Sequence, residues 1–297
     1  MSALDELQQA AATVAERLDA ATVAIGQDWR GSGMVIAPNQ VLTCAHNLRD
    51  RTTEVTFADG RQVQGTVLGV DADGDLVVLE VDTAGAAPVA WGSGTPAVGQ
   101  AVFGVARAEG PRVTFGLVSS TGRTFRGPRG RRIAGSVEHT APLARGATGG
   151  PLADTEGRVV AINTLRLGDR FALAQPADAE FQALVGRLAA GESPTRRRLG
   201  VALAPAHVAR RLRRSVGLPE RDGLLVRGVE DGSPAATAGV ETGDLLVAAG
   251  GTPLATADDL FAVLEGAEAT LRLTVVRGTD EREVEVRFEE TPTAADG

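Results

Sequence analysis

Short apolar runs separated by turn residues recur over residues 21–190, and this spacing constrains the fold more than any other feature of the chain. Each run is too short for a stable helix and is rich in β-branched residues, which favour strands. Many short strands at close spacing predict a barrel or a sandwich. The predicted strands lie at residues 22–25, 33–36, 41–43, 54–57, 63–70, 76–81, 101–105, 113–118, 158–165 and 171–174.

The pattern changes on both sides of this all-β region. Residues 1–20 carry apolar side chains at helical spacing, and Ser2 with Asp5 forms a capping-box pattern at their start. These residues are therefore predicted to form an amphipathic helix. The remaining segments are predicted to be a closing helix at 181–190, a linker at 191–197, strands with two short helices over 198–290, and a disordered acidic tail at 291–297.

Composition argues against several kinds of site. The net charge is −8, and the arginine clusters lack interleaved aromatic residues, which argues against nucleic-acid binding. Cys44 is the single cysteine, so no intrachain disulfide can form. The chain has three widely separated histidines, so we expect no metal site and no cofactor. The first residues resemble neither a signal peptide nor a membrane span, which leads us to expect a cytoplasmic protein.

A hydroxyl residue lies inside a glycine-rich turn, Gly146-Ala147-Thr148-Gly149-Gly150. Glycine adopts left-handed backbone without strain, so such a turn can push the Thr148 side chain outward. The N–H groups of Gly146 and Thr148 could then stabilise an oxyanion. Upstream, His46 follows one apolar run and Asp75 precedes another. The order histidine, aspartate, hydroxyl is that of a chymotrypsin-type triad, and it predicts nucleophilic catalysis.

Taken together, these motifs resemble those of the HtrA (Deg) protease family. The first region carries the resemblance at Gly31-Ser32-Gly33, Leu42–His46, Asp71–Leu79, Gly116–Gly122, Gly146–Leu152 and Val160–Asn163. The second carries it at Leu199-Gly200-Val201, Gly232–Ala236, Ala238–Val240 and Gly243-Asp244. The resemblance implies a mainly β fold, in which a two-barrel chymotrypsin-like (trypsin-like) protease domain at 21–190 precedes an α+β PDZ domain at 198–290.

The resemblance also implies a role for each residue of the triad. His46 is the expected general base, Asp75 is expected to orient it, and Thr148 occupies the position of the family's serine. The turn departs from the family pattern, because Ala147 replaces asparagine and Arg145 replaces proline. The extra methyl group and restricted χ1 of threonine can aim its oxygen away from the base. Weak or absent proteolysis is therefore expected.

Two binding sites follow from the same resemblance. Pro142 lies six positions before the nucleophile, at the expected base of the primary pocket, so no carboxylate is available there for a basic substrate side chain. Aliphatic side chains are expected instead, in a pocket walled by Ala161, Ile162, Asn163, Phe171, Ala172 and Leu173. The PDZ groove is expected to bind peptides with an apolar C-terminus through Arg198, Leu199, Gly200, Val201, Leu260 and Leu264.

Three further residues could take part in chemistry by their residue type alone. Cys44 among apolar neighbours is expected to be an inert buried thiol, and His139 and His207 are expected to be packing or surface residues. Two functions remain open: a slow endopeptidase of unfolded or misfolded polypeptide, or a pseudoprotease that holds peptides as a chaperone or scaffold. Neither nucleic acid nor a membrane is expected as a partner. A homo-oligomer agrees with the family's usual trimers, although the aromatic N-terminal contacts of those trimers are not evident here.

Overall fold

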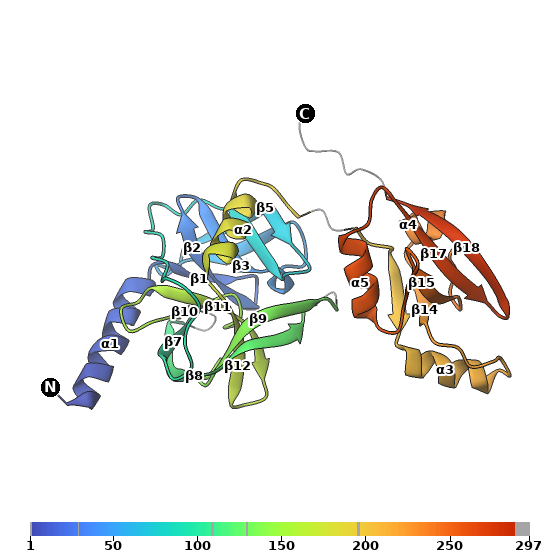
Figure 1. Cartoon of the computed structure of the whole chain (residues 1–297). Coiled ribbons are helices and arrows are strands. Elements are labelled where there is room, and N and C mark those ends of the chain that lie inside the picture. The colour runs from blue at the N-terminus through green and yellow to red at the C-terminus, as the bar shows by residue number, and fades with distance from the viewer. Residues whose placement is uncertain (1, 29, 108–109, 129, 195–196, 289–297) are drawn as a thin grey trace. The chain divides into compact units, whose positions relative to one another are not determined.

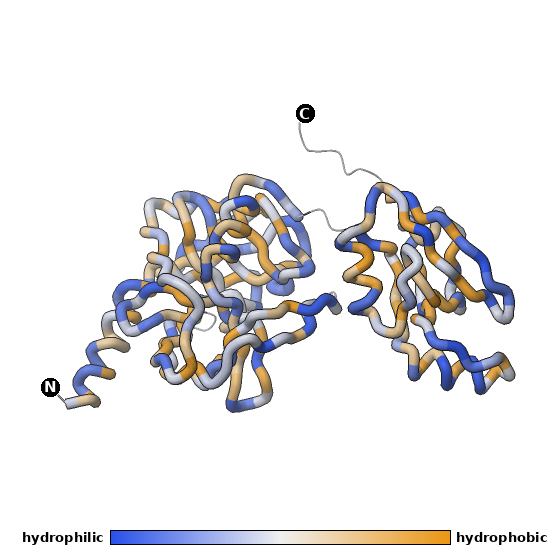
Figure 2. The backbone as a smooth tube through the Cα atoms, in the orientation of Figure 1, coloured by the Kyte–Doolittle hydropathy of each residue, from blue (hydrophilic) through white to orange (hydrophobic). Residues whose placement is uncertain are grey.

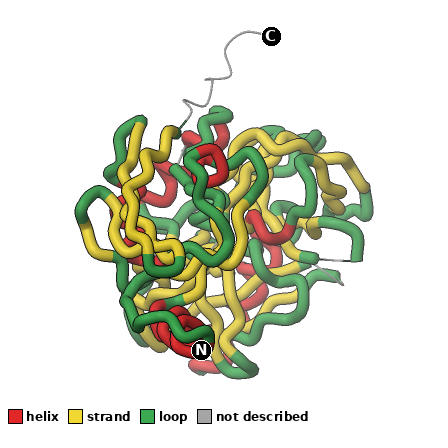
Figure 3. The backbone as a smooth tube through the Cα atoms, turned by 90° about the vertical axis from the view of Figure 1, so that its right-hand side faces the viewer, coloured by secondary structure: helices red, strands yellow, loops and turns green. Residues whose placement is uncertain are grey.

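The computed structural model describes residues 2–28, 30–107, 110–128, 130–194 and 197–288 (Figure 1). The chain divides into two compact units, Met1–Pro194 and Thr195–Gly297. Strands are more abundant than helices in the described backbone, as the yellow and red segments of Figure 3 show. Apolar and polar segments alternate along it (Figure 2), and each unit buries a hydrophobic core of its own.

The first unit begins with a closed barrel whose strands follow the order β1-β2-β3-β6-β5-β4. Closure pairs every strand on both sides and so leaves no exposed edge. The strands are β1 (Thr22–Ile25), β2 (Gly31–Ala37), β3 (Gln40–Cys44), β4 (Thr52–Thr56), β5 (Gln62–Asp71) and β6 (Leu76–Glu80). The interior contains fully or nearly fully buried apolar side chains, among them Val23, Ile25, Val41, Val77 and Leu79.

A second closed barrel follows, with the strand order β10-β11-β12-β9-β8-β7. Its strands are β7 (Ala101–Ala106), β8 (Arg112–Arg126), β9 (Arg132–His139), β10 (Pro151–Ala153), β11 (Val159–Leu167) and β12 (Phe171–Pro176). The loop between β9 and β10 contains the glycine-rich turn around Thr148, and the register of β10 on β11 places this loop beside Asn163.

Two helices close the first unit, α1 (Ala3–Leu18) and α2 (Ala179–Ala189). The capping box predicted for α1 is present, because Ser2 accepts the Asp5 N–H and Asp5 accepts the Ser2 N–H. The largest apolar cluster unites both helices with both barrels, which holds the barrels in one unit. It includes Leu18, Met34, Leu76, Phe103, Ile162 and Leu188.

The second unit is a sheet with the strand order β13-β14-β15-β17-β18, to which β16 adds beside β15. Its strands are β13 (Val201–Ala204), β14 (Leu224–Val229), β15 (Leu245–Ala249), β16 (Thr252–Pro253), β17 (Thr270–Arg277) and β18 (Asp280–Arg287). Its helices are α3 (Ala206–Ser215), α4 (Pro234–Thr237) and α5 (Ala257–Glu265). β13 lies at one edge of the sheet, so its outer side is available for a further strand.

The fold class predicted from the sequence is confirmed: two barrels are followed by a smaller α+β sheet domain. Sequence reasoning did not identify β9, β10 or α3. Leu199 and Gly200, which were predicted to belong to a strand, precede β13 instead. The tail predicted to be disordered lies outside the described residues. No helix in the described ranges combines the length and the apolarity needed to cross a membrane.

Candidate active site

His46 and Asp75 are brought together by neighbouring strands of the first barrel. β3 pairs with β6 so that Cys44 lies opposite Leu76, which places the residues just beyond these positions side by side. The Asp75 carboxylate lies 2.7 Å from His46 Nδ1 through Oδ2, and its Oδ1 accepts the His46 backbone N–H at 2.9 Å. Asp75 is buried and has a φ of 61°, a left-handed conformation that aspartate tolerates better than most residues. The carboxylate therefore fixes the orientation of the imidazole and keeps a proton on Nδ1.

The turn before Thr148 leaves two backbone donors free. The Ala147 N–H donates to the Ala144 carbonyl at 3.2 Å, and Gly146 between them has a φ of 74°. Such a positive φ is the one that the third residue of a type II turn requires. Within the described part of the chain, neither the Gly146 N–H nor the Thr148 N–H donates a hydrogen bond. Both groups remain available to a substrate carbonyl oxygen.

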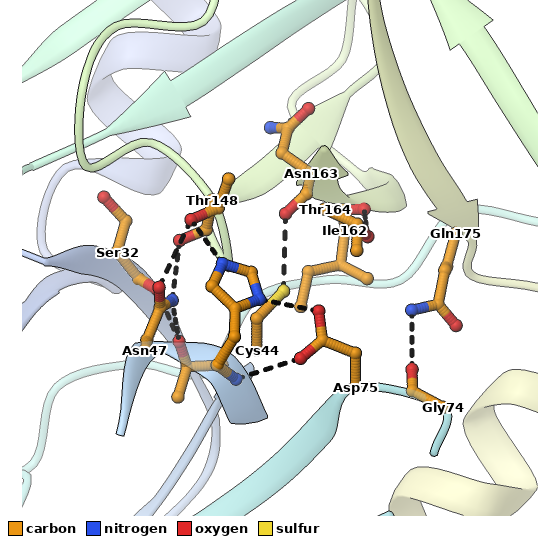
Figure 4. A network of polar contacts seen from close by, with 12 residues as sticks. Ser32, Cys44, Asn47, Gly74, Asp75, Thr148, Ile162, Asn163, Thr164 and Gln175 are labelled. Atoms are coloured by element: carbon orange, nitrogen blue, oxygen red, sulfur yellow. Dashed lines mark hydrogen bonds and ion pairs between the residues drawn. The ribbon is translucent and has the colours of Figure 1, made fainter. Parts of the chain in front are cut away.

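The Thr148 hydroxyl faces the base. Its Oγ1 lies 3.1 Å from His46 Nε2, while Asp75 contacts the other ring nitrogen of His46 (Figure 4). The expectation that the methyl group would aim the oxygen away from His46 is therefore wrong. Thr148 is half-buried, and the pair it forms with His46 joins residues 102 positions apart in the sequence. The three predicted triad residues form one continuous row of polar contacts.

Sequence reasoning missed two polar residues that hold this turn, Ser32 and Asn47. The Ser32 N–H donates to the Thr148 carbonyl at 2.9 Å, and Ser32 Oγ donates to the Gly146 carbonyl at 2.8 Å. Asn47 contacts both the carbonyl and the hydroxyl of Thr148. The only signal in the sequence was their position, Asn47 next to His46 and Ser32 between two glycines of β2. Their partners lie more than 100 positions away, at separations of 114 and 101.

The residues predicted to wall the primary pocket are not all placed together. Ala161–Asn163 lie on β11 and are fully buried, and the Asn163 carbonyl accepts the Gly149 N–H at 2.7 Å, directly beneath the turn. On the neighbouring strand Ala172 and Leu173 are also buried. Phe171 is different: it is 40% exposed and pairs with Leu167 at the far end of the β11–β12 hairpin. Pro142 was predicted to lie at the base of the pocket, but its side chain is exposed.

A fully buried pair, His139 and Asn163, supports the turn. Asn163 Nδ2 donates to the carbonyls of Gly150 and Pro151 at 3.2 and 3.0 Å, so its Oδ1 is left to accept a hydrogen bond. His139 Nε2 lies 3.0 Å from that oxygen and therefore carries the ring proton. Burial lowers the pKa of His139 to about 4, so the ring is neutral at neutral pH. His139 is thus a packing residue, whereas His207 is exposed.

An open pocket of about 550 Å³ lies beside His46, and sequence reasoning did not identify it. Its apolar lining comes from β5 and β6, with Val67, Val70 and Val77 among the contributors. Arg49 and Arg51 also line it and are exposed. The surface next to the base can therefore accommodate an aliphatic side chain of a bound polypeptide.

Cys44 lies behind the triad, and its Sγ, His46 and Asp75 offer ligand atoms within 4.8 Å of one another. The arrangement does not suit a metal ion, because His46 Nδ1 is already bound to Asp75 and the thiol donates to the Asn163 carbonyl at 3.6 Å. Burial, and then the charge of Asp75, raise the pKa of the Cys44 thiol well above its usual value. A thiol of this kind is protonated and is neither a metal ligand nor a nucleophile.

In the second unit, the predicted peptide-binding residues fall into two groups. Leu199, Leu260 and Leu264 are buried together in one apolar core. Gly200 has a φ of 75°, and in the described residues neither its N–H nor that of Leu199 donates a hydrogen bond. Val201 is half-buried at the start of the edge strand β13.

The remaining predicted peptide-binding residue, Arg198, forms an exposed ion pair with Glu230 at 2.5 Å. Its charge is therefore partly balanced before any peptide binds, and its field at the loop is weaker than the sequence suggested.

Comparisons with known proteins agree with this arrangement. A family model described as a trypsin-like peptidase domain matches residues 31–162, and one described as a PDZ domain matches residues 225–277.

The serine protease homologue HhoA of Synechocystis sp. is 32% identical over 268 residues, which cover 84% of this chain and 68% of HhoA. The mitochondrial serine protease HTRA2 of Drosophila grimshawi is 28% identical, over 88% of this chain and 66% of HTRA2. A periplasmic DegP-like serine endoprotease of Rickettsia conorii is 25% identical, over 86% of this chain and 52% of its own length. The chain thus spans between about half and two thirds of the length of these curated relatives.

Solved structures show the same fold. The HtrA-type protease AlgW, determined with a decapeptide, has a TM-score of 0.62 at 20% identity and covers 93% of this chain and 97% of its own. A serine endoprotease from Yersinia pestis has a TM-score of 0.61 at 22% identity and covers 93% of this chain and 96% of its own. At these identities the likeness describes the fold.

Proposed function

Because this chain belongs to the HtrA family of serine proteases, with a trypsin-like peptidase domain followed by a PDZ domain, we propose that it is a slow endopeptidase of unfolded or misfolded polypeptide. The observation that carries the proposal is the unbroken row of contacts from Asp75 through His46 to the Thr148 hydroxyl, at 2.7 and 3.1 Å. These distances lie in the range over which a base can take a proton from a nucleophile.

Each residue has a defined part in the reaction. His46 Nε2 takes the proton of the Thr148 hydroxyl as Oγ1 attacks the scissile carbonyl carbon, and the carbonyl electron pair moves onto its oxygen. The N–H groups of Gly146 and Thr148 stabilise that oxyanion. Collapse of the intermediate breaks the C–N bond, and the imidazolium gives its proton to the leaving amine. A water molecule, deprotonated by His46, then hydrolyses the Thr148 ester, while Asp75 stabilises the imidazolium in both steps.

The methyl group of Thr148 is the reason to expect a low rate. The turn must accommodate it while Oγ1 moves toward the carbonyl carbon, and overpacking of this kind costs roughly 1–3 kcal/mol. A displacement of about 1 Å at a reacting atom lowers a rate on the order of a hundredfold. The well-placed hydroxyl of the resting structure therefore does not restore the rate of a serine enzyme.

Aliphatic side chains are the proposed specificity at the scissile bond. Position 142 carries a proline and not an acidic residue, and the apolar side chain of Ala172 is buried against Ala147 of the turn. The apolar pocket beside His46 extends the same preference to a neighbouring residue of the substrate. A mainly apolar cleft favours segments that folded proteins bury and unfolded ones expose.

The test of the proposal is casein hydrolysis by the wild-type chain and by the Thr148→Ala variant, purified in parallel. The wild type is expected to release peptides slowly and the variant none, because alanine has no nucleophilic atom. Mass spectrometry of the products then gives the residues before each cleaved bond. Equal release by both proteins would assign the proteolysis to a contaminant and leave the second function below.

The alternative function is a pseudoprotease that holds peptides without cleaving them. It is favoured by the second unit, where the N–H groups of Leu199 and Gly200, which have no acceptor among the described residues, lie next to the edge strand β13. A peptide can add to such an edge as a further strand, with its C-terminal carboxylate on the free N–H groups. In this function, peptide binding persists in a chain that has no protease activity.

Peptide binding by this loop predicts a dependence on the terminal carboxylate. A peptide ending in an apolar residue is expected to bind the Thr148→Ala chain about tenfold more tightly than its C-terminally amidated twin, because hydrogen bonds to a charged acceptor are the stronger ones. Fluorescence anisotropy of the two labelled peptides measures the difference. Equal affinities would mean that the loop does not recognise the carboxylate, and the groove assignment would then be abandoned.

A further inference from the structure

We propose that Asn47 is a positioning residue that selects the rotamer of Thr148 in which the hydroxyl faces His46, and thereby makes threonine usable at this position. The inference rests on the proposed function for its catalytic meaning, but the geometry it describes can be measured without any activity.

The orientation of the Asn47 amide is fixed by its neighbours. Its Nδ2 donates to Thr43 Oγ1 at 3.0 Å and to the Thr148 carbonyl at 2.9 Å, which uses both of its hydrogens. Thr43 Oγ1 gives its own proton to the Ser32 carbonyl at 2.7 Å, so towards Asn47 it can only accept. The Asn47 Oδ1 atom must therefore be the one that faces the Thr148 hydroxyl, at 3.2 Å.

Asn47 also has little room to move. It is 2% exposed and lies in the short helix η1 (Ala45–Asn47), immediately after His46. A Cβ atom at Gly31 would lie 2.1 Å from Asn47 Nδ2, and one at Gly149 would lie 2.8 Å from the same atom. The amide fills the space that these two glycines leave open, so it cannot turn its oxygen away from Thr148.

The Thr148 hydroxyl consequently meets two acceptors, His46 Nε2 at 3.1 Å and Asn47 Oδ1 at 3.2 Å, with one proton to donate (Figure 4). Both acceptors lie on the side to which Oγ1 points, whereas the other staggered rotamers would offer them the methyl group or the Cβ hydrogen. Two acceptors at one place stabilise this rotamer more than either does alone. Asn47 thus offsets the tendency of threonine to place its oxygen elsewhere.

The same arrangement predicts that a serine depends on Asn47 less than a threonine does. Serine has no methyl group to exclude, so its oxygen can reach His46 from a wider range of χ1 angles. The turn itself does not depend on Asn47 alone. Ser32 N–H also holds the Thr148 carbonyl, and Ser32 Oγ joins the Gly146 carbonyl to the Arg107 N–H at 3.1 Å. Loss of the Asn47 side chain therefore weakens the rotamer preference and leaves the turn anchored.

The first experiment measures the Thr148 rotamer itself. Three-bond couplings from the threonine methyl carbon to the backbone carbonyl carbon and nitrogen give χ1 in the intact, isotope-labelled chain. The wild type is expected to show the couplings of a single rotamer, and Asn47→Ala the averaged couplings of several. Ser32→Ala is the matched control, because it removes a support of the turn without touching the Thr148 hydroxyl, and its couplings should stay those of the wild type. Unchanged couplings in Asn47→Ala, or equal averaging in both variants, would overturn the proposal.

The second experiment separates positioning from a general structural role. The rate of covalent labelling by a fluorophosphonate is compared with and without Asn47→Ala, in the wild-type chain and in the Thr148→Ser variant. We expect at least a fivefold loss in the threonine protein and less than a twofold loss in the serine variant. Equal losses in both would contradict the proposal. If the threonine protein does not label at all, the proposed function fails, and the couplings still decide the role of Asn47.

Discussion

The Thr148→Ser variant is expected to cleave casein roughly ten- to hundredfold faster than the wild-type chain, because it keeps the hydroxyl and removes the methyl group that a threonine adds to the packed turn. The rest of the machinery is already in place. Asp75 holds His46 at 2.7 Å, and the N–H groups of Gly146 and Thr148 are free among the described residues. Initial rates of peptide release from labelled casein measure the gain.

The control for this experiment is a second substitution, His46→Ala, in the serine variant. It should abolish the gain, because no other described side chain can take the proton of the hydroxyl. A serine variant as inert as the parent would contradict the prediction. It would place the defect in the backbone of the turn around Ala147, where the family pattern has asparagine, and would favour the peptide-holding function.

The stability of the first unit is expected to fall as the pH drops from about 7 to about 4, in part because of His139. Burial lowers the pKa of this residue from 6.5 to about 4, so in that interval the unfolded chain binds a proton that the folded chain does not. The contribution of His139 to the free energy of unfolding is therefore complete above the pKa of the unfolded state, 6.5, and decreases as the pH falls below that value. The full shift corresponds to about 3 kcal/mol of unfolding free energy.

The measurement is denaturant unfolding followed by tryptophan fluorescence at several pH values. Trp29 and Trp91, the two tryptophans of the chain, both belong to the first unit, so the signal reports that unit alone. His139→Gln is the comparison variant, because its amide N–H can still reach Asn163 Oδ1 but does not titrate. Its unfolding free energy should depend less on pH than that of the wild type. Identical pH dependence in the two proteins would show that His139 already titrates normally in the folded state.

Much of the fold could be predicted from the sequence because the strands of the two barrels are short, apolar and bounded by turn residues. The strands that escaped prediction show the limits of that signal. β9 is interrupted by Gly135 and its polar and apolar residues do not alternate regularly, and β10 has only three residues, so neither is distinct from a loop by local pattern. They become strands because β8, β11 and β12 supply hydrogen-bond partners.

Helix α3 shows the same dependence on context. Its sequence is rich in arginine, and its apolar face is formed by Val208, Ala209 and Leu212. Arg213 is nevertheless buried, where its guanidinium donates to the carbonyls of Pro219 and Gly278. A long side chain that finds backbone acceptors in this way can occupy a position that an apolar residue usually fills. No pattern of residue types within the helix indicates those partners.

By itself, the sequence determined which residues to consider as a catalytic triad, because a histidine, an aspartate and a hydroxyl residue in a glycine-rich turn follow one another in the order of that triad. Only the tertiary structure decided which way the hydroxyl points. That choice depends on His46 and Asn47, whose contacts with Thr148 span 102 and 101 positions of the chain. The local preference of a threonine side chain is weak, and acceptors brought to it by the meeting of two barrels outweigh it.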